Sequence, residues 1–468
     1  MRSKYFYLYL IIFLEGYVVL STELIAIRQL IPFVGSGTET VAIIISAVLM
    51  PLAFGYYFGG KFKAKQGRGG LVTIREKLIR NVLNSTVFLV IGLSYILLQL
   101  FFFGIDKIGI HHRVFQTSVY AIIFLVAPIF MLGQTVPLIS NFFMRENLSK
   151  LTGKILFFST LGSFMGAIIS TIILMSLIGV NNTLIFNIAI LALVVVILSK
   201  RILCINNILM AIFLVTAFFF NSTSMMRKLN IVENNRYSTI SIIKDHDGGK
   251  IININNSSSG KYSPDPEKRF PYLQFIEKTF INPLLKDNKK KKILVLGAGG
   301  FTIGVDDKLN DYTFVDIDFS LKDISEKYLL PEKLGQNKKF NAQDARAFLS
   351  SNKEKYDLIF LDVFSNIQSI PSYLLTLEFF KQVDSHLENN GVMIFNCITN
   401  PAFSNRYSVK LDNTLREVFP NINRQIIGEF NGWDENPDED KNIIYMYFNK
   451  KVSSAIYTDD KNTYFLDH

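Results

Sequence analysis

The first 222 residues of the chain contain seven apolar runs, each about as long as a helix needs to cross a lipid bilayer. Short polar connections separate them, and they cover residues 5–27, 38–59, 86–105, 115–140, 155–179, 183–199 and 204–221. About 20 consecutive apolar residues span a hydrocarbon core. The mean hydropathy of +0.28 over all 468 residues agrees with this assignment. We therefore predict an α-helical multi-span membrane domain over residues 1–222, with six or seven helices.

Two pairs of glycine residues occur four positions apart inside these runs. They are Gly55 with Gly59, and Gly162 with Gly166. Small residues at this spacing let neighbouring helix backbones approach each other closely. The pattern predicts helix packing at these positions.

The first apolar run also contains ionisable residues, which is unusual for a membrane span. Glu15 and Glu23 lie within it, and Arg28 lies at its end. Charged groups at membrane depth are costly and by default indicate function. A Glu23–Arg28 ion pair that only fixes the helix near an interface is an equally good interpretation, so both stay open.

The composition changes near residue 225, where charged residues, Asn and Ser become frequent and apolar runs shrink to strand length. We predict a small β-rich segment over residues 226–285 and an α/β domain over 286–468. Two cysteines, Cys204 and Cys397, are too few for a disulfide framework. Neither a metal-ligand spacing nor a nucleic-acid motif accompanies the net charge of +10, so we expect no metal site and no nucleic-acid partner.

A glycine cluster marks the start of the predicted α/β domain. The short strand 292–296 is followed by Gly297, Gly299 and Gly300, and then by a second strand that ends at Asp316. Strand, glycine turn, helix, strand and acid form the first unit of a doubly wound, Rossmann-like nucleotide-binding sheet. The glycines let the backbone approach a ligand, and the acid can accept both ribose hydroxyls.

Two further acids follow later predicted strands, Asp344 after the third and Asp362 after the fourth. In open α/β sheets ligands bind beyond the carboxyl ends of the strands. A single acid at a strand end is commonly a helix cap. Three acids and a glycine turn at successive strand ends favour a binding site.

The combined motifs resemble the spermidine synthase (polyamine aminopropyltransferase) family, in the branch that joins a multi-span helical half to a methyltransferase-like domain. In the soluble half the resemblance rests on residues 236–237, 270–274, 297–300, 315–318, 344–349 and 356–365. In the membrane half it rests on residues 23–30, 55–61, 131–137 and the glycines from Gly153 to Gly179.

The resemblance implies transfer of an aminopropyl group from decarboxylated S-adenosylmethionine, a co-substrate rather than a permanently bound cofactor, to an amine such as putrescine. Asp362 would be the catalytic acid that orients the amine and accepts its proton. The residues that would bind the nucleoside are Gly297, Gly299, Gly300, Asp316 (ribose), Asp344 (adenine) and Ala345. The residues that would bind the amine are Tyr237, Ser238, Tyr272 and Ser365. Membrane lipid and a second copy, paired through the soluble domain, are the implied partners.

Several positions depart from the family pattern, among them Asp316, which replaces the ribose-binding Glu, and the missing proline that usually follows the second acid. Gly300 replaces an acid in the glycine turn, Leu273 replaces a His, Ser365 replaces a second acid, and Ser238 replaces a Gln. Loss of the acid at Gly300 removes a charge that would repel the carboxylate of ordinary S-adenosylmethionine. A methyl- or alkyltransferase that uses ordinary S-adenosylmethionine therefore stays an alternative. A non-enzymatic membrane transporter or sensor with a nucleoside- or polyamine-binding domain is the other.

The basic loops predict the orientation in the membrane. Lys and Arg concentrate in residues 60–85, 145–154 and 200–201, which we place on the cytoplasmic side. Six spans would then leave the soluble half inside the cell, whereas seven would place it outside. Because the implied co-substrate favours the cytoplasm, we expect a multi-pass protein of the cell membrane with a cytoplasmic soluble half, although the count of seven argues otherwise.

Overall fold

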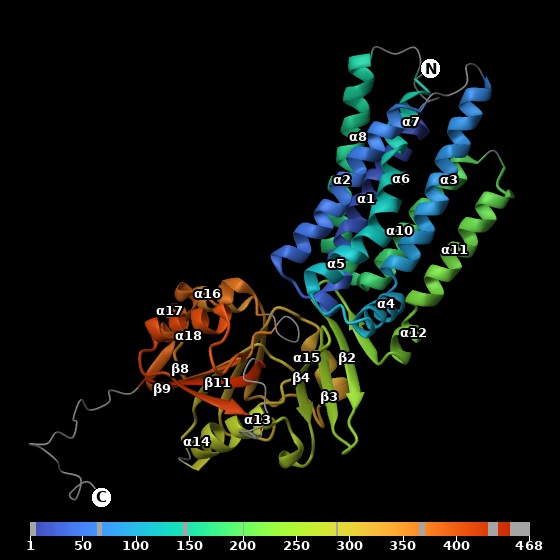
Figure 1. Cartoon of the computed structure of the whole chain (residues 1–468). Helices are drawn as coiled ribbons and strands as arrows, with labels where there is room; N and C mark the ends of the chain where they lie inside the picture. The colour runs from blue at the N-terminus through green and yellow to red at the C-terminus, as the bar shows by residue number, and fades with distance from the viewer. Residues whose placement is uncertain are drawn as a thin grey trace, which may run out of the picture. The chain divides into compact units, whose positions relative to one another are not determined.

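The computed structural model describes residues 6–62, 68–143, 148–199, 201–286, 289–364, 370–428 and 439–449. The chain forms two compact units, the first from the amino terminus to Ser259 and the second from Gly260 onward. Figure 1 shows a helical bundle in the first and an α/β sheet in the second.

Helices make up most of the first unit. They are α1 (Phe6–Val34), α2 (Thr38–Gly60), α3 (Arg68–Leu93), α4 (Tyr95–Lys107), α5 (Arg113–Ala121), η2 (Ile122–Val126), α6 (Ala127–Gly133), α7 (Thr135–Ser140), α8 (Leu148–Ile168), η3 (Ile169–Leu174), α9 (Met175–Leu177), α10 (Gly179–Leu198), α11 (Ile205–Asn221) and α12 (Thr223–Lys228).

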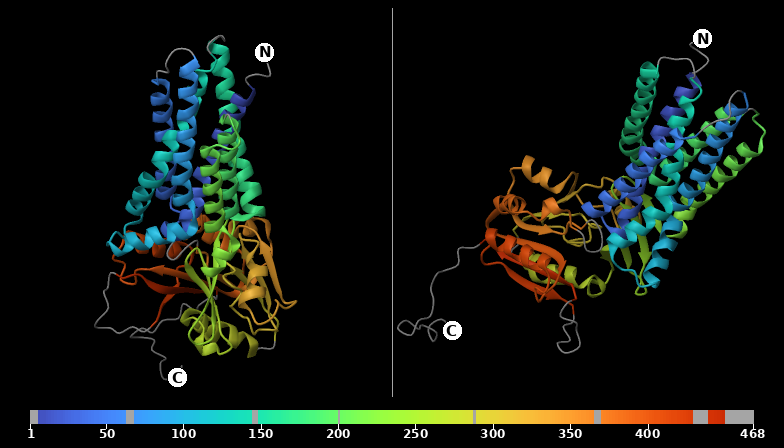
Figure 2. Two further views of the ribbon diagram at one scale, coloured as in Figure 1. Left: turned by 90° about the vertical axis from the view of Figure 1, so that its right-hand side faces the viewer. Right: turned by 45° about the horizontal axis from the view of Figure 1, so that its top comes forward.

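Six helical stretches of the described residues are long and apolar enough to cross a membrane. They are Phe6–Val34, Thr38–Gly60, Arg113–Ser140, Ser149–Leu177, Gly179–Leu198 and Ile205–Lys228. The stretch predicted as one span over 86–105 is not a straight helix, because α3 and α4 meet there at a bend of 68°, which is the form of a broken span or a re-entrant loop. Ser94 between them has an extended backbone (φ −77°, ψ 123°), which interrupts the helical hydrogen-bond ladder. The basic stretch predicted as a loop over 60–85 is largely helical, since α3 begins at Arg68. Figure 2 shows α4 lying across the end of the bundle.

Glycines bring α1 into backbone contact with α8. A first side-chain carbon on Gly162 would lie 2.0 Å from the carbonyl oxygen of Phe13, and one on Gly166 would lie 2.3 Å from that of Tyr17. Gly55 approaches the carbonyl oxygen of Phe130 in the same way, at 2.6 Å. Only glycine permits such approaches, so the predicted packing role of these glycines is confirmed.

A small sheet follows the bundle along the chain. Its strands β1 (Ile231–Asn234), β2 (Thr239–Lys244), β3 (Lys250–Ile254) and β4 (Ser257–Tyr262) lie in chain order, with β1–β2 and β2–β3 antiparallel. The Arg28 side chain at the carboxyl end of α1 donates to the carbonyl oxygen of Asn235 (2.8 Å) and to Thr239 Oγ1 (3.2 Å). These bonds attach the β1–β2 hairpin to that end of the bundle.

The second unit is built on a seven-stranded sheet in the order β10-β11-β9-β8-β5-β6-β7. Its strands are β5 (Lys292–Leu296), β6 (Asp311–Asp316), β7 (Lys338–Ala342), β8 (Tyr356–Leu361), β9 (Leu387–Thr399), β10 (Asn423–Ile427) and β11 (Lys441–Phe448). Strands β7, β6, β5, β8 and β9 are parallel, whereas β11 is antiparallel to both its neighbours. The predicted Rossmann-like, methyltransferase-like doubly wound fold is confirmed.

Helices cover both faces of this sheet (Figure 1). One face carries α16 (Ala345–Ser351), α17 (Leu377–Ser385) and α18 (Arg406–Val418), and the other carries α13 (Pro271–Ile276) and α14 (Asn282–Lys286). The remaining helical pieces are η4 (Pro266–Lys268), η5 (Glu277–Ile281), α15 (Leu321–Ile324), η6 (Ser325–Leu329) and η7 (Ser372–Leu374). Because both faces are covered, central strands are continuous apolar runs, and Ile293 to Leu296 are at most 1% exposed.

The helix predicted after the glycine turn is absent. Residues 297–310, between β5 and β6, form turns and bends only. Four of them, Gly297, Gly299, Phe301 and Gly304, have φ between +56° and +90°, a left-handed conformation that stops a right-handed helix. The connection between two parallel strands is therefore an irregular loop here, and no helix amino terminus faces the glycine turn.

Candidate functional site

Four predicted site residues lie at the carboxyl ends of neighbouring strands. Gly297 follows β5, Asp316 ends β6 and Asp362 follows β8, while Asp344 comes two residues after β7. Leu296 of β5 is in register with Val315 of β6 and with Leu361 of β8. The strand order reverses between β5 and β8, which is the topological switch point where such sheets bind ligands.

Gly297 is required by two local features. Its φ is +90°, and a first side-chain carbon there would lie 2.1 Å from the carbonyl oxygen of Asp362. Its amide donates to the carbonyl oxygen of Val315 (2.9 Å), so the turn is fixed between two strands. Gly299 also has a positive φ (+56°), and Gly300 is buried beside it.

Asp316 ties this turn to the next loop. Its Oδ2 accepts from the amide of Ala298 and its Oδ1 from the amide of Asp318, both at 3.0 Å. Burial raises the pKa of Asp316 to about 6, although both amide hydrogen bonds lower it. The carboxylate is half-buried, and its two oxygens together offer about four acceptor positions, so it can still accept from a bound hydroxyl.

Asp344 is the amino-terminal cap of α16. Its Oδ1 accepts from the amide of Ala347 (2.9 Å), and its Oδ2 accepts from the hydroxyl of Tyr373 (2.6 Å). Asp344 therefore acts as a helix cap, which is the common role of an acid at the end of a strand. Ala345, the first residue of α16, is 8% exposed. Neither contact tests the predicted adenine contact of Asp344 and Ala345.

Asp362, Tyr272 and Asn396 form a cluster beside Gly297, which we call the Asp362 cluster. The Tyr272 hydroxyl donates to Asp362 Oδ2 (3.3 Å), and Asn396 Nδ2 donates to Asp362 Oδ1 (2.9 Å). Burial raises the pKa of Asp362 to about 6, although the two hydrogen bonds lower it. Burial and the charge of Asp362 both raise the pKa of Tyr272, which therefore stays protonated and donates.

Asn396, a member of the Asp362 cluster, was not predicted from the sequence. It lies in β9, next to the end of β8, and is 4% exposed. Its Oδ1 has no hydrogen-bond partner, and an unsatisfied buried acceptor costs about 1–3 kcal/mol. A donor on a bound molecule would remove that cost. The available signal was a lone polar side chain inside the apolar run from Val392 to Ile398.

The other predicted amine-binding residues are placed differently. Tyr237 and Ser238 belong to the first unit, where the Asn235 side chain accepts from their amides (2.7 and 3.0 Å) in the β1–β2 turn. The guanidinium of Arg236 stacks 4.5 Å from the ring of Tyr237 and donates to its hydroxyl. Ser365 lies outside the described residues.

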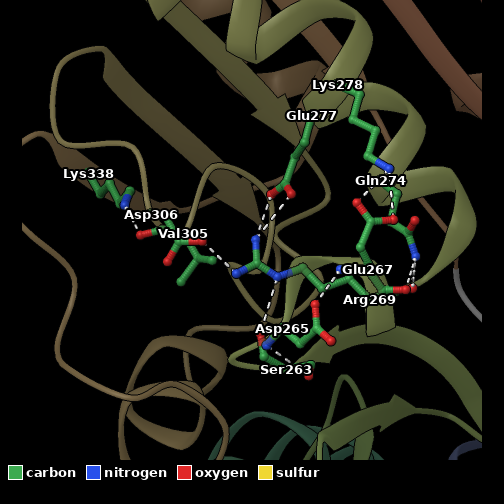
Figure 3. Close-up of polar contacts among 10 residues, drawn as sticks. All are labelled: Ser263, Asp265, Glu267, Arg269, Gln274, Glu277, Lys278, Val305, Asp306 and Lys338. Carbon is green, nitrogen blue, oxygen red and sulfur yellow. Dashed lines mark hydrogen bonds and ion pairs between the residues drawn. The ribbon is translucent and has the colours of Figure 1, made fainter.

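Arg269, a buried arginine three residues before Tyr272, bonds to several segments of the second unit (Figure 3). Arg269 donates to both carboxylate oxygens of Glu277 (3.2 and 3.1 Å), to Asp306 (2.5 Å) and to the carbonyl oxygen of Ser263 (3.4 Å). The same guanidinium thus joins η5 to the loop that follows the glycine turn. Arg269 immediately precedes the Phe-Pro-Tyr motif but was not singled out from the sequence, which does not show that its side chain reaches Asp306, 37 residues further along.

Among the described residues, no group of three or more His, Cys, Asp and Glu side chains is arranged to hold a metal ion. The site at the strand ends consists of a glycine turn, three carboxylates and the donors around Asp362. Such a set can hold a ribose and a cationic centre, and it can accept a proton from a bound amine.

Residues 275–427 match the spermine/spermidine synthase domain. The polyamine aminopropyltransferase of Saccharolobus solfataricus is 34% identical over 150 residues, which are 30% of this chain and 50% of that protein. That of Sulfurisphaera tokodaii is 31% identical over 156 residues, 31% of this chain and 51% of that protein. The chain thus spans about half the length of these curated relatives.

Two solved structures are similar over the same half. A probable spermidine synthase from Corynebacterium glutamicum has a TM-score of 0.39 and 24% identity, covering 47% of this chain and 81% of that one. The spermidine synthase of Thermotoga maritima has a TM-score of 0.36 and 15% identity, covering 47% of this chain and 73% of that one.

Proposed function

We propose that this protein, whose residues 275–427 match the spermine/spermidine synthase domain, is a membrane-bound aminopropyltransferase. It transfers the aminopropyl group of decarboxylated S-adenosylmethionine to an amine such as putrescine. The Asp362 cluster is the observation that carries the proposal. A half-buried carboxylate with an elevated pKa lies directly beside a glycine turn at the switch point of the sheet.

The chemistry suits these side chains. The sulfonium makes the adjacent carbon electrophilic, an amine nitrogen attacks it, the C–N bond forms and the C–S bond breaks. Free amines are mostly protonated at neutral pH, since their pKa lies near 10. Asp362 orients the amine and takes its proton, which typically contributes about 10²- to 10⁴-fold. The free Oδ1 of Asn396 accepts a second amine hydrogen and so fixes the direction of attack.

The nucleoside half of the site follows the strand edge. Gly297 and Gly299, with Gly300 beside them, let the backbone reach the sulfonium nucleoside. Asp316 holds the ribose hydroxyls, and Asp344 with Ala345 reads the adenine. Support comes from their common position at the carboxyl ends of β5, β6 and β7.

A methyl- or alkyltransferase that uses ordinary S-adenosylmethionine is the second candidate. The observation that favours it is Gly300, a buried glycine with no charge to oppose a substrate carboxylate. Both candidates use the same nucleoside site, so they differ in which form of the co-substrate binds more tightly.

We assign the protein to the cell membrane as a multi-pass protein. The number of times that the chain crosses the membrane determines which side the second unit occupies. Helix α3 runs the length of the bundle, since Lys77 near its start lies 4.2 Å from the ring of Phe62, and Ser94 at its end accepts from Asn221 (2.9 Å). If α3 and α4 form one bent span, the six spans become seven passes.

This count favours the extracytoplasmic side for the domain that follows β4. The basic stretches lie at the Lys77 end of the bundle, and Arg28 attaches the β1–β2 hairpin at the other end. The co-substrate favours the cytoplasm instead. A reporter at the carboxyl terminus of the full chain separates the two: active alkaline phosphatase would place the domain outside, and a fluorescent green fluorescent protein would place it inside.

The decisive experiment uses the full chain in detergent. Thermal stability is measured with decarboxylated and with ordinary S-adenosylmethionine, because a ligand at 100 times its Kd stabilises the folded state by about 2.7 kcal/mol. Stabilisation by the decarboxylated form, lost in Asp316→Ala, and transfer to putrescine support the proposal. Preference for the ordinary form moves it to the second candidate, and a folded protein that responds to neither contradicts both. Light scattering of the same sample tests the implied homodimer.

A further inference from the structure

Two glutamates inside the bundle have oxygens without partners. Glu15 of α1 is 3% exposed, and neither of its carboxylate oxygens has a hydrogen-bond partner. Glu23 is 7% exposed, and its Oε2 has none. Both belong to the apolar helical stretch Phe6–Val34, which is long enough to cross a membrane, and at a rise of 1.5 Å per residue they lie about 13 and 25 Å along it from Phe6.

Burying an ionised, unpaired carboxylate in a membrane span is energetically costly. The cost disappears when the carboxylate binds a proton or a cation. The described residues contain no group of three metal ligands, which argues against a metal ion. A proton or an ammonium group needs only one carboxylate. The two glutamates therefore suit protons and amine cations.

A cluster of polar side chains lies along α1 between the two positions, without a printed bond to either glutamate. Between them along α1, Ser21 Oγ lies 2.6 Å from Ser170 Oγ and accepts from Asn187 Nδ2 (2.8 Å), while the Tyr17 hydroxyl lies 3.1 Å from Ser170 Oγ. Ser170 belongs to η3, a π-helical turn within the span Ser149–Leu177. Such turns occur frequently at functional sites, and this one presents Ser170 to α1.

Among the residues that the structure describes, the other ionisable side chains along this part of the bundle include those of Tyr56, Lys154 and Arg28. Tyr56 of α2 faces Glu15 and bonds to Ser159 of α8. Near the start of α1, the ammonium group of Lys154 of α8 lies 5.8 Å from the ring of Tyr9. Near the end of α1, Arg28 bonds to the β1–β2 hairpin. These groups leave the Glu15 carboxylate oxygens without a hydrogen bond.

We propose that the helical half is a proton-coupled carrier of amine cations, with Glu15 and Glu23 as its exchange sites. At each, one proton leaves the carboxyl group as one ammonium group binds, so the charge of the site is unchanged. The choice of polyamines as cargo rests on the proposed transferase, whose product is a polyamine.

The test uses the full chain in liposomes that contain a pH-sensitive dye and carry a spermidine gradient. The wild type should move protons against the spermidine flow. Glu15→Gln and Glu23→Gln should each slow this by at least about tenfold, or about 1.4 kcal/mol. Glu39→Gln, an exposed glutamate in the first turn of α2, is the matched control and should leave the rate unchanged. No proton movement in the wild type, or a Glu15→Gln rate equal to the wild type, would overturn the proposal.

Two further arms keep the result interpretable. Asp362→Asn should keep transport and lose aminopropyl transfer, so a failure of the transferase proposal is seen separately. Dicyclohexylcarbodiimide, which reacts with protonated carboxyl groups in apolar surroundings, should label Glu15 in the wild type, and spermidine should protect it. Labelling that spermidine does not reduce would count against an amine site at Glu15, whatever the folding of the variants.

Discussion

The two halves of the chain hold buried carboxyl groups in opposite ways. At the sheet edge, Asp362 accepts hydrogen bonds from Tyr272 and Asn396, which fix its orientation. In the bundle, neither oxygen of Glu15 has a hydrogen-bond partner. A carboxylate held by donors is prepared to take one proton at one place, which suits catalysis. A carboxylate without donors is stable only when a proton or cation occupies it, which suits binding and release.

Replacing Asp362 by asparagine should give the largest effect. The amide keeps the shape but cannot take a proton, so transfer to putrescine should fall by about 10²- to 10⁴-fold. Asp357→Asn is the control, because Asp357 lies on the same strand and pairs with Lys291 (3.2 Å) away from the cluster. The measurement is the turnover rate of the full chain, and an Asp362→Asn rate within about twofold of the wild type would remove Asp362 from the mechanism.

Asp362→Asn should lower the transfer rate but raise the folding stability at neutral pH. Because burial raises the folded-state pKa of Asp362 above its unfolded value, the folded protein holds this proton more tightly. That contribution is present at low pH and is lost as the pH rises through about 6. Asp362→Asn should therefore raise the thermal unfolding temperature at pH 7 more than at pH 4. An equal change at both pH values would contradict the raised pKa.

Glycine substitutions compare the close contacts of the two halves. Gly297→Ala meets both a left-handed backbone and the Asp362 carbonyl, each costing about 1–3 kcal/mol. Gly162→Ala meets only the carbonyl of Phe13 and should cost less. Gly248→Ala isolates the backbone cost, because its φ is +83° and no atom lies within 4 Å. Denaturant unfolding should show the largest loss of unfolding free energy for Gly297→Ala, a smaller one for Gly162→Ala and the smallest for Gly248→Ala. A loss for Gly248→Ala as large as that for Gly297→Ala would contradict the close approach at Gly297.

Asn396→Ala sharpens the role of the donors around Asp362. A hydrogen bond to an ionised carboxylate favours the charged form, so its loss should raise the pKa of Asp362 further. In the wild type, kcat/KM should fall as the pH drops below about 6, because the proton acceptor becomes protonated. In Asn396→Ala the midpoint should move to higher pH. A lower rate with an unmoved midpoint would mean that Asn396 only shapes the amine pocket.

Arg269→Lys should give the smallest effect. Lysine keeps the charge but cannot bind Glu277 through two parallel hydrogen bonds and reach Asp306 as well. The glycine loop and the Tyr272 segment should loosen, lowering kcat by less than about tenfold, or 1.4 kcal/mol. The KM for the amine should stay constant. A larger loss in KM than in kcat would place Arg269 in amine binding instead.

The strand edge could be predicted from sequence because its signals are local. Each parallel strand is a short apolar run, and the carboxyl ends of parallel strands lie at the same edge of the sheet. The residues at these ends, Gly297, Asp316 and Asp362, could therefore be predicted to lie together. The helix after the glycine turn was predicted wrongly, because the pattern does not show that Phe301 and Gly304 adopt a left-handed backbone. The break at Ser94 was missed for a similar reason, since mean hydropathy carries no information on helix direction.

The sequence alone determined the division into an apolar helical half and an α/β half, the glycine contacts within the bundle and the row of acids along the sheet edge. These follow from residue periodicity and from backbone limits that act within a few residues. Only the tertiary structure decided that Asn396 and Tyr272 hold Asp362, that Arg269 joins η5 to the glycine loop, and that the Glu15 oxygens have no hydrogen-bond partner. These features depend on side chains far apart in the chain, so they are decided only once distant strands and helices have packed together.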